Sequence, residues 1–331
     1  MGRKLEMIVP GLFDLPPGEV DREFVVAQLP HVNRLLGRAG SVPNECFTID
    51  AMVLDLFGQN LQQSLPLAES MRQEADPTGD CVLFQPIHLH ADFQNAIILP
   101  IQNDDNYGKD ISLIINDLGE LFKEDFYIRS LSNQTFIMIF KDIVVPTHFP
   151  HFISVLGKSS NPYLEQSRQK LAWYKLLNEI QMYLHQHPAN QQRTSRGATA
   201  INSFWFYGAG ALDQPIGTEL TWFCDDELLR QFGDHMSFNC NPLQGFAMND
   251  SVSDAVLIDL RLITALKTNQ NQDLKSLLLE LDRDVFAPAF DGYTNIRLRA
   301  GFGQDFLWSR QSHLKFWVKP RNLSDWSIPA V

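Results

Sequence analysis

Residues 185–210 combine polar, charged and glycine positions in a pattern typical of a binding loop. The preceding residues 171–184 carry apolar side chains at helical spacing, and we expect Pro188 to end this helix. Residues 201–207 then predict a buried strand. Arginine side chains suit recognition of carboxylate or phosphate groups. The predicted ligand-binding residues are His187, Asn190, Arg193, Arg196, Asn202, Trp205, Gly208 and Gly210.

The same residues also have a structural interpretation, which the sequence leaves open. Asn190, Arg193 and Arg196 can equally be solvated or tie the loop to the core. Trp205, with its aromatic neighbours, is more typical of a core residue than of a ligand platform. The two glycines would allow a backbone or a ligand to approach closely. Whether the segment binds a ligand or stabilises the fold depends on which residues the fold brings next to it.

Three motifs in this region resemble a known family. They are Asn-Glu-Ile-Gln-Met at 178–182, His-Pro-x-Asn-x-x-Arg at 187–193 and Asn-Ser-x-Trp-Phe-x-Gly-x-Gly at 202–210. They resemble the RpfE-type bacterial regulatory proteins. More distantly, the chain is similar to the archaeal-type cofactor-independent phosphoglycerate mutases of the alkaline-phosphatase-like superfamily. That resemblance implies an α/β fold, two divalent metals held by Asp and His, and a Ser or Thr nucleophile.

The chain departs from that pattern where the chemistry would take place. Pro10 stands at the position of the first metal-binding aspartate, and Ile49 at that of the nucleophile. Adjacent Thr48 could serve only if the alignment slips by one residue. The ligands implied after a later strand are also missing, because residues 260–272 contain no aspartate and no histidine occurs between His235 and His313. We therefore expect no metal site, no cofactor and no catalytic residue, while a rearranged site remains an alternative.

Two short motifs that contain histidine, Asp234-His235 and His88-Leu-His90, are candidate metal ligands. Asp234-His235 precedes the strand that its counterpart follows in the resembled family, and a solvated turn is the favoured interpretation. His88 and His90 would share one face of a strand, but two surface histidines are favoured there.

Strands alternating with helices predict an α/β fold, an alkaline-phosphatase-like sheet flanked by helices with an inserted smaller α+β cap domain. Residues 1–80 and 201–331 would form the main domain, and 81–200 the cap. The segment 185–210 would lie at the hinge and cleft between them. We expect a strand at 5–9 to share the main sheet with a strand at 255–260. Further strands are predicted at 81–84, 96–101, 135–140, 201–207, 219–223 and 295–299, and helices at 29–38, 49–57, 111–122, 226–232 and 273–286.

Composition excludes several classes of protein. With 331 residues, 44% of them hydrophobic and 20% charged, the chain is an ordinary globular protein. A formal net charge of −12 disfavours a nucleic-acid or anionic-membrane surface. The four cysteines form no Cys-x-x-Cys pair, and no apolar run suggests a signal peptide or a membrane span. We expect a cytoplasmic protein.

These features together predict a degenerate phosphoglycerate-mutase-like protein. It would be a non-catalytic regulatory or binding protein, and its partner a small anionic ligand or a protein. Two alternatives remain open. One is an active metal-dependent phosphotransferase with a rebuilt site, and the other is a structural subunit of a complex.

Overall fold

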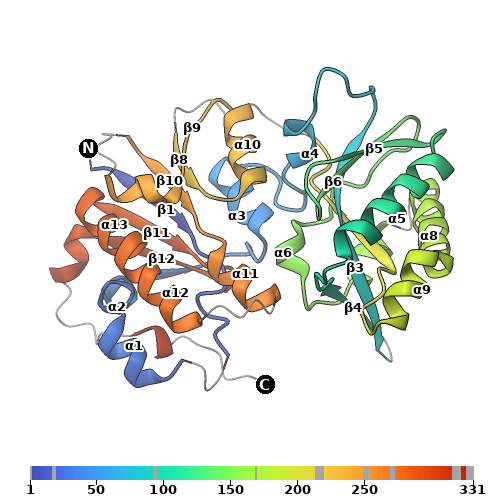
Figure 1. The fold of residues 1–331 in the computed structure, drawn as a ribbon. Coiled ribbons are helices and arrows are strands. Elements are labelled where there is room, and N and C mark those ends of the chain that lie inside the picture. The colour runs from blue at the N-terminus through green and yellow to red at the C-terminus, as the bar shows by residue number, and fades with distance from the viewer. Residues whose placement is uncertain are drawn as a thin grey trace. The chain divides into compact units, whose positions relative to one another are not determined.

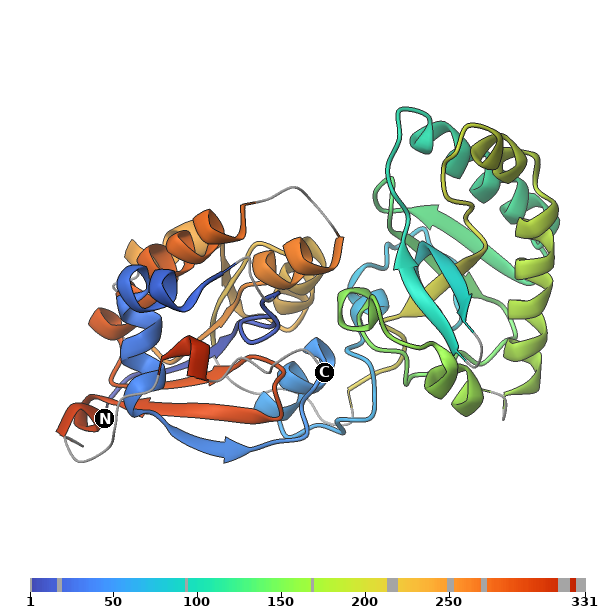
Figure 2. The ribbon, with the colours of Figure 1, turned by 90° about the horizontal axis from the view of Figure 1, so that it is seen from below.

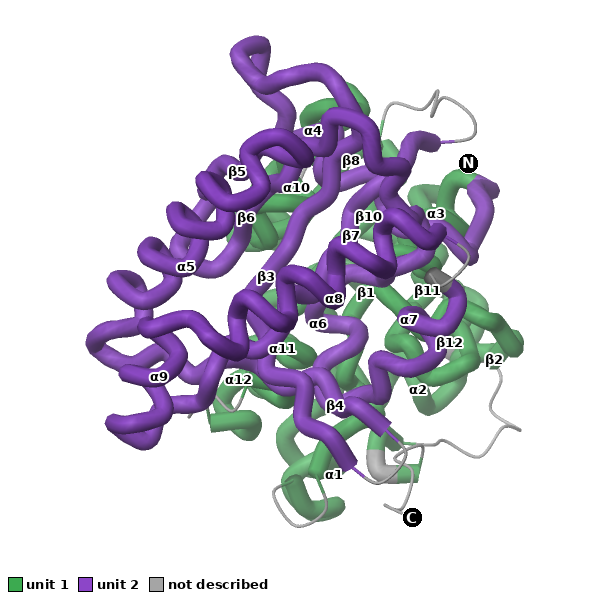
Figure 3. The backbone as a smooth tube through the Cα atoms, turned by 90° about the vertical axis from the view of Figure 1, so that its right-hand side faces the viewer, with its two compact units in different colours: residues 1–57, 215–331 green, residues 58–214 purple. Residues whose placement is uncertain are grey.

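The computed structural model describes residues 2–16, 20–92, 95–167, 170–212, 220–248, 253–268, 273–314 and 322–325. The chain divides into two compact units, here called unit 1 (residues 1–57 and 215–331) and unit 2 (residues 58–214) (Figure 3). Each is built on its own sheet and is described by itself.

Unit 1 contains a seven-stranded sheet in the order β2-β12-β11-β1-β10-β8-β9 (Figure 1). The strands are β1 (Lys4–Ile8), β2 (Gly40–Pro43), β8 (Thr221–Cys224), β9 (Asn239–Asn241), β10 (Ala255–Ile258), β11 (Asn295–Arg299) and β12 (Gln304–Ser309). Strands β11, β1, β10, β8 and β9 are parallel, whereas β12 and β2 add antiparallel strands at one edge. Figure 2 shows β2, in blue, beside the orange-red β12.

Helices cover both faces of this sheet. The main core joins Leu5, Met7 and Leu257 to one set of helices. That set comprises α1 (Arg22–Gln28), α2 (Pro30–Arg38), α11 (Arg261–Thr268), α12 (Leu274–Leu281) and α13 (Ala287–Gly292). On the opposite face lie α3 (Ile49–Leu56) and α10 (Glu227–His235), because Asp55 of α3 contacts Arg299 and Gly233 of α10 packs on Trp222. Short 3-10 segments at Leu243–Met248, Arg310–Leu314 and Leu323–Asp325 complete the described part of unit 1.

A π-helical segment, Asp282–Phe286, joins α12 to α13. Pro288 follows at the start of α13 and lacks the N–H that would bond to the carbonyl of residue 284 in an α-helix. The wider turn therefore occurs where the regular hydrogen-bond ladder is interrupted. It brings Asp282 to the N-terminus of α2, where its Oδ1 accepts the backbone N–H groups of His31 and Val32 at 2.9 and 2.8 Å.

Unit 2 is built on a five-stranded antiparallel sheet in which the long strand β3 is central. The strands are β3 (Cys81–Asp92), β4 (Asn95–Pro100), β5 (Phe126–Ser130), β6 (Phe136–Phe140) and β7 (Ser203–Tyr207). The helices are α4 (Leu67–Ser70), α5 (Tyr107–Leu121), α6 (Phe152–Val155), α7 (Asn161–Ser167), α8 (Leu171–Gln186) and α9 (Pro188–Ser195). Tyr207, Phe84, Phe126, Phe140 and Trp173 are among the largest fully buried side chains of the unit.

The predicted α/β fold class, a sheet flanked by helices, is confirmed. The strands expected at 5–9 and 255–260 do share one sheet, in which they are β1 and β10 and pair in parallel. The strand predicted at 219–223 is β8, with residue 219 outside the described residues. The placement of residues 201–207 in the main sheet was wrong, because β7 pairs with β3 of unit 2 over Ser203–Tyr207. Along the sequence, the boundaries between the two compact units fall at 57/58 and 214/215, and residues 81–200, the expected cap, lie within unit 2. No helix in the described residues is long and apolar enough to cross a membrane.

Candidate functional site

The segment predicted to leave regular structure after Pro188 instead begins a second helix. His187 has an extended backbone and its ring Nδ1 accepts the N–H of Ala189 at 3.1 Å, so it caps α9, with Pro188 as the first helical residue. Proline is favoured there because its missing N–H would have no partner within the helix. The prediction that Pro188 ends α8 holds, but the loop expected beyond it was wrong.

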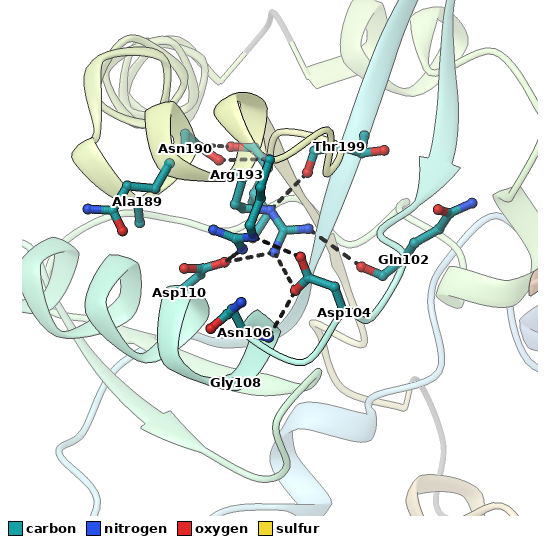
Figure 4. A network of polar contacts seen from close by, with 12 residues as sticks. Gln102, Asp104, Asn106, Gly108, Asp110, Ala189, Asn190, Arg193 and Thr199 are labelled. Carbon is teal, nitrogen blue, oxygen red and sulfur yellow. Dashed lines mark hydrogen bonds and ion pairs between the residues drawn. The ribbon is translucent and has the colours of Figure 1, made fainter.

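Arg193 is fully buried, and its hydrogen bonds within the described residues go to Asp110, Thr199 and Gln102 of the same unit (Figure 4). Its Nε donates to the Thr199 carbonyl at 2.9 Å, and its Nη1 lies 3.1 Å from Oδ2 of Asp110, which is also buried. Nη2 reaches the carbonyl of Gln102 at 3.5 Å. Arg193 therefore connects α9 to the first turn of α5. It also binds Gln102, which lies before α5, and Thr199, which lies after α9.

Arg196 completes this network from the end of α9. Its Nε donates to Asp104 Oδ2 at 3.0 Å, and its Nη2 pairs with Asp110. The hydrogen bond from Arg196 lowers the pKa of Asp104, and that same bond raises the pKa of Arg196. The Arg196 side chain is 27% exposed, whereas that of Arg193 is 0% exposed. We call Arg193, Arg196, Asp104 and Asp110 the arginine clasp.

Two asparagines of the predicted site hold backbone segments in place. Asn190 donates to the carbonyls of Leu184 and Ile201, both at 2.7 Å, and accepts the N–H of Ile201 at 2.8 Å. Asn202 accepts the N–H of Leu89 at 2.7 Å and donates to its carbonyl at 3.0 Å. An amide side chain that satisfies both groups of a backbone unit replaces a missing strand neighbour. The Nε2 atom of His187 adds a contact of 3.2 Å with Asp117 on α5.

The remaining predicted residues lie in or against the core of unit 2. Trp205 is 2% exposed, and its indole N–H donates to the Pro150 carbonyl at 2.9 Å. Gly208 has φ +77°, and a Cβ there would lie 3.1 Å from Cβ of Leu67, where α4 approaches. Its carbonyl accepts the N–H of Ala68 at 2.9 Å. The close approach predicted at Gly208 is thus made by the protein's own chain. Gly210 is exposed, yet it has φ +110° and a Cβ there would lie 3.0 Å from Cγ2 of Thr147.

Sequence reasoning missed the carboxylates of the arginine clasp. Asp110 lies 83 positions before Arg193, and no local motif joins them. Asp110 directly precedes the amphipathic helix predicted at 111–122, where an acidic residue favours the helix N-terminus, but this signal indicates no partner for it. The structure brings Asn190, Arg193 and Arg196 close to one another and leaves Trp205 in a separate aromatic cluster with Phe149 and Tyr163. Whether the segment also binds a ligand stays a prediction.

The carboxyl ends of the parallel strands in unit 1 form the second candidate site, since ligands of open α/β sheets bind at this edge. Strand β1 ends before Pro10 and Gly11. Gly11 has φ +89°, and a Cβ there would lie 3.2 Å from the backbone of Ile263. Thr48 caps α3, with its hydroxyl accepting the N–H of Ala51 at 3.2 Å. At this edge Pro10 and Gly11 therefore shape the turn after β1, and the Thr48 hydroxyl is used as the N-cap of α3.

Asp259 follows β10 at the same edge and is 0% exposed. Arg261 binds it with Nη2 to Oδ2 at 2.7 Å and Nε to both oxygens at 3.1 and 3.2 Å. The backbone N–H of Arg261 donates to Oδ1 at 3.0 Å. Hydrogen bonding to Asp259 raises the pKa of Arg261. The buried carboxylate thus has its charge compensated by a guanidinium two positions away.

A second ion network lies on the face of the unit 1 sheet where Glu6 of β1 and Arg299 of β11 meet Asp55 of α3. Arg299 is 1% exposed, and it binds Asp55 at 2.6 Å and Glu6 at 3.2 Å. Arg297 binds Asp305, which is 0% exposed. Burial raises the pKa of Glu6, and this effect outweighs the lowering by Arg299 and Arg297. Both arginines again have carboxylate partners within their own unit.

The two histidine-containing candidates for metal binding have other environments. Asp234 and His235 are exposed at the end of α10, in agreement with the solvated turn favoured from sequence. The ring of His88 is 2.9 Å from the Ala200 carbonyl through Nδ1. In the described ranges no three His, Cys, Asp or Glu side chains converge as metal ligands would.

Comparisons with known proteins identify a fold. No protein-family model and no curated protein matches the chain. Among solved structures, the PH0037 protein from Pyrococcus horikoshii matches with a TM-score of 0.53 and 13% identity, over 93% of this chain and 87% of that one. A cofactor-independent phosphoglycerate mutase from Thermoplasma acidophilum matches with a TM-score of 0.45 and 14% identity, over 100% and 96% of the two chains. At such low identity, the likeness to PH0037 shows a shared fold alone.

Proposed function

We propose that this chain is a non-catalytic, phosphoglycerate mutase-like protein that acts by binding another protein in a regulatory role. The observation that carries the proposal is the pairing of Asp259 with Arg261 at the carboxyl edge of the unit 1 sheet. A buried carboxylate at such an edge suits a metal cation. Here a side chain of the same protein supplies the positive charge.

The donor set at this edge does not fit the two divalent cations that the resemblance implies. Pro10 offers no ligand atom after β1, and Ala300 follows β11. Both oxygens of Asp259 accept N–H groups from Arg261, and the Thr48 hydroxyl caps α3. An activated hydroxyl and two cations need free oxygen and nitrogen ligands in open positions. We therefore derive no phosphoryl-transfer step for these residues.

A protein partner is favoured over a small anionic ligand because the arginines are already paired with carboxylates. At the candidate sites, Arg193, Arg196, Arg261, Arg297 and Arg299 each contact a carboxylate of their own unit. An anionic ligand would have to displace one of these carboxylates from its arginine, and the two negative charges would repel each other. A protein surface can instead use exposed apolar and polar groups without breaking the pairs. Similarity of 178–182, 187–193 and 202–210 to the RpfE-type proteins supports a regulatory role.

The test is a coupled assay for interconversion of 2- and 3-phosphoglycerate, with manganese or magnesium added and an authentic phosphoglycerate mutase as positive control. We expect no turnover above the rate without protein. Turnover that rises with added metal and is abolished by a chelator would overturn the proposal in favour of a rebuilt active site. A matched Thr48→Ala variant would then show whether the threonine is the nucleophile.

A further inference from the structure

Strand β3 carries two histidines, His88 and His90, on one face of the unit 2 sheet. Side chains two positions apart on a strand lie on the same side, so both rings stand above the same part of the sheet. The centroids of the two rings are 6.3 Å apart, and the ring planes are inclined by 37°. His88 is half-buried and His90 is exposed. An ion from solvent can therefore reach both rings from the same side.

A hydrogen bond to the backbone decides which nitrogen of His88 is available to an ion. Nδ1 of His88 lies 2.9 Å from the carbonyl oxygen of Ala200. Because a carbonyl oxygen can only accept, the hydrogen of the neutral ring is on Nδ1 and the lone pair is on Nε2. Histidines that bind metals are typically oriented in this way, by donating the other ring N–H to a carbonyl or carboxylate group. The preceding carbonyl, that of Thr199, accepts Nε of Arg193 at 2.9 Å, so the segment that orients His88 is itself held in place.

The surroundings of the two histidines suit a cation. Ile97 and Leu99 of β4 stand directly opposite His90 and His88, and both are half-buried. These aliphatic side chains have no polar group that would compete for the ring nitrogens. Asp92 follows His90 two positions along β3, so its exposed carboxylate adds a negative charge to the same face.

We propose that Nε2 of His88 and a ring nitrogen of His90 together bind one zinc ion. Bonds from zinc to imidazole nitrogen are about 2.0–2.1 Å long, so two rings on one ion have centroids roughly 5–6.5 Å apart. The observed 6.3 Å lies within that range, and the exposed ring of His90 can turn toward His88. Zinc is favoured over magnesium and manganese, because imidazole suits zinc whereas the other two prefer oxygen ligands.

This site lies in unit 2, and the proposal is independent of the function proposed above. Two protein ligands are fewer than the three or four of catalytic and structural zinc sites. Among the described residues, no group of three His, Cys, Asp or Glu side chains converges that would supply a third ligand. We therefore expect zinc to exchange with solvent, to be lost during purification and to bind again when it is supplied.

The experiment is isothermal titration calorimetry of the full chain with zinc chloride. We expect saturable binding, and expect His88→Gln and His90→Gln each to weaken it roughly ten-fold or more, because each variant removes one of the two ligands. His235→Gln is the matched control. His235 is also exposed and stands beside an aspartate, but it lies on α10 of unit 1. This variant should bind zinc like the unmodified protein.

Far-UV circular dichroism of each variant separates loss of the ion from loss of the fold. His90→Gln keeps the test decisive if His88→Gln fails to fold, because substitution of an exposed side chain changes stability little. The absence of saturable zinc binding in the unmodified protein overturns the proposal. So does zinc affinity that is unchanged in the folded β3 variants or reduced only in His235→Gln, and so does manganese that binds as tightly as zinc.

Discussion

Arginine meets aspartate in both units, but the two pairs differ in sequence separation and in burial. In unit 2, Arg193 and Asp110 are 83 positions apart, and both side chains are almost fully buried. In unit 1, Arg261 and Asp259 are two positions apart, and the arginine is 34% exposed. The first pair connects α9 to α5, whereas the second compensates a charge within one turn of chain. The difference teaches that the same ion pair can join two helices that are distant in sequence or compensate a charge within one turn of chain.

The largest effect is expected for Arg193→Ala. It leaves the Asp110 carboxylate buried with only Arg196 beside it and frees the Thr199 carbonyl. Removing one partner of a buried pair costs about 3–5 kcal/mol. The free energy of unfolding, measured by denaturant titration, should fall by that amount. The binding-site prediction from sequence implies a small change in stability instead, so unchanged stability with weakened ligand binding would favour that reading.

Arg196→Ala is the matched control within the clasp. Its side chain is partly exposed, and Asp110 retains Arg193 as a partner. We expect a clearly smaller loss of stability than for Arg193→Ala. Equal losses would mean that burial does not distinguish the two arginines.

Arg261→Ala should have an intermediate effect. Asp259 would keep the backbone N–H of residue 261 but lose the guanidinium that compensates its charge. Removing one partner of a buried ion pair costs about 3–5 kcal/mol, and because the Arg261 side chain is 34% exposed, water can enter its place and bring the loss to the lower end of that range or below it. Thermal and denaturant unfolding measure it. A loss as large as that of Arg193→Ala would remove the contrast between the two pairs.

Glu6→Gln should have the smallest effect, and its sign depends on pH. The folded pKa of Glu6 is raised by burial, so the stability contributed by this group is complete below its unfolded pKa and is lost as pH rises through the folded pKa. The glutamine variant should match the parent protein in acid and equal or exceed its stability at neutral pH. A variant that is less stable at neutral pH than in acid, relative to the parent, would show that the Arg299 contact dominates.

Sequence alone predicted the local elements well, because their signals are local. The stripe at 171–184 is α8, and the strand at 201–207 was recognised as β7. The pairing of β7 with β3 was not, since more than a hundred residues separate them and no residue type encodes a sheet partner. Helix α9 has a local signal in Pro188, because proline is a favoured first helical residue, but the same proline equally indicates the end of α8.

The candidate site was located from sequence, but its role was not. Asn190 and Arg193 were singled out by their polar side chains in an otherwise apolar region. A buried brace and a binding site use the same residue types, and only the position of Asp110 and of the backbone around Ile201 distinguishes them. Arg261 was not singled out at all, because a charged residue that begins a helix has many ordinary explanations.

The central claim is that the chain's own arginine, and no metal ion, compensates the buried carboxylate at the sheet edge of unit 1. Its most direct test is elemental analysis of the purified protein, combined with thermal unfolding in the presence of manganese and of a chelator. We expect no stoichiometric divalent metal and an unfolding temperature that neither reagent changes. Two metal ions per chain, or an unfolding temperature that manganese raises and the chelator lowers, would contradict the account.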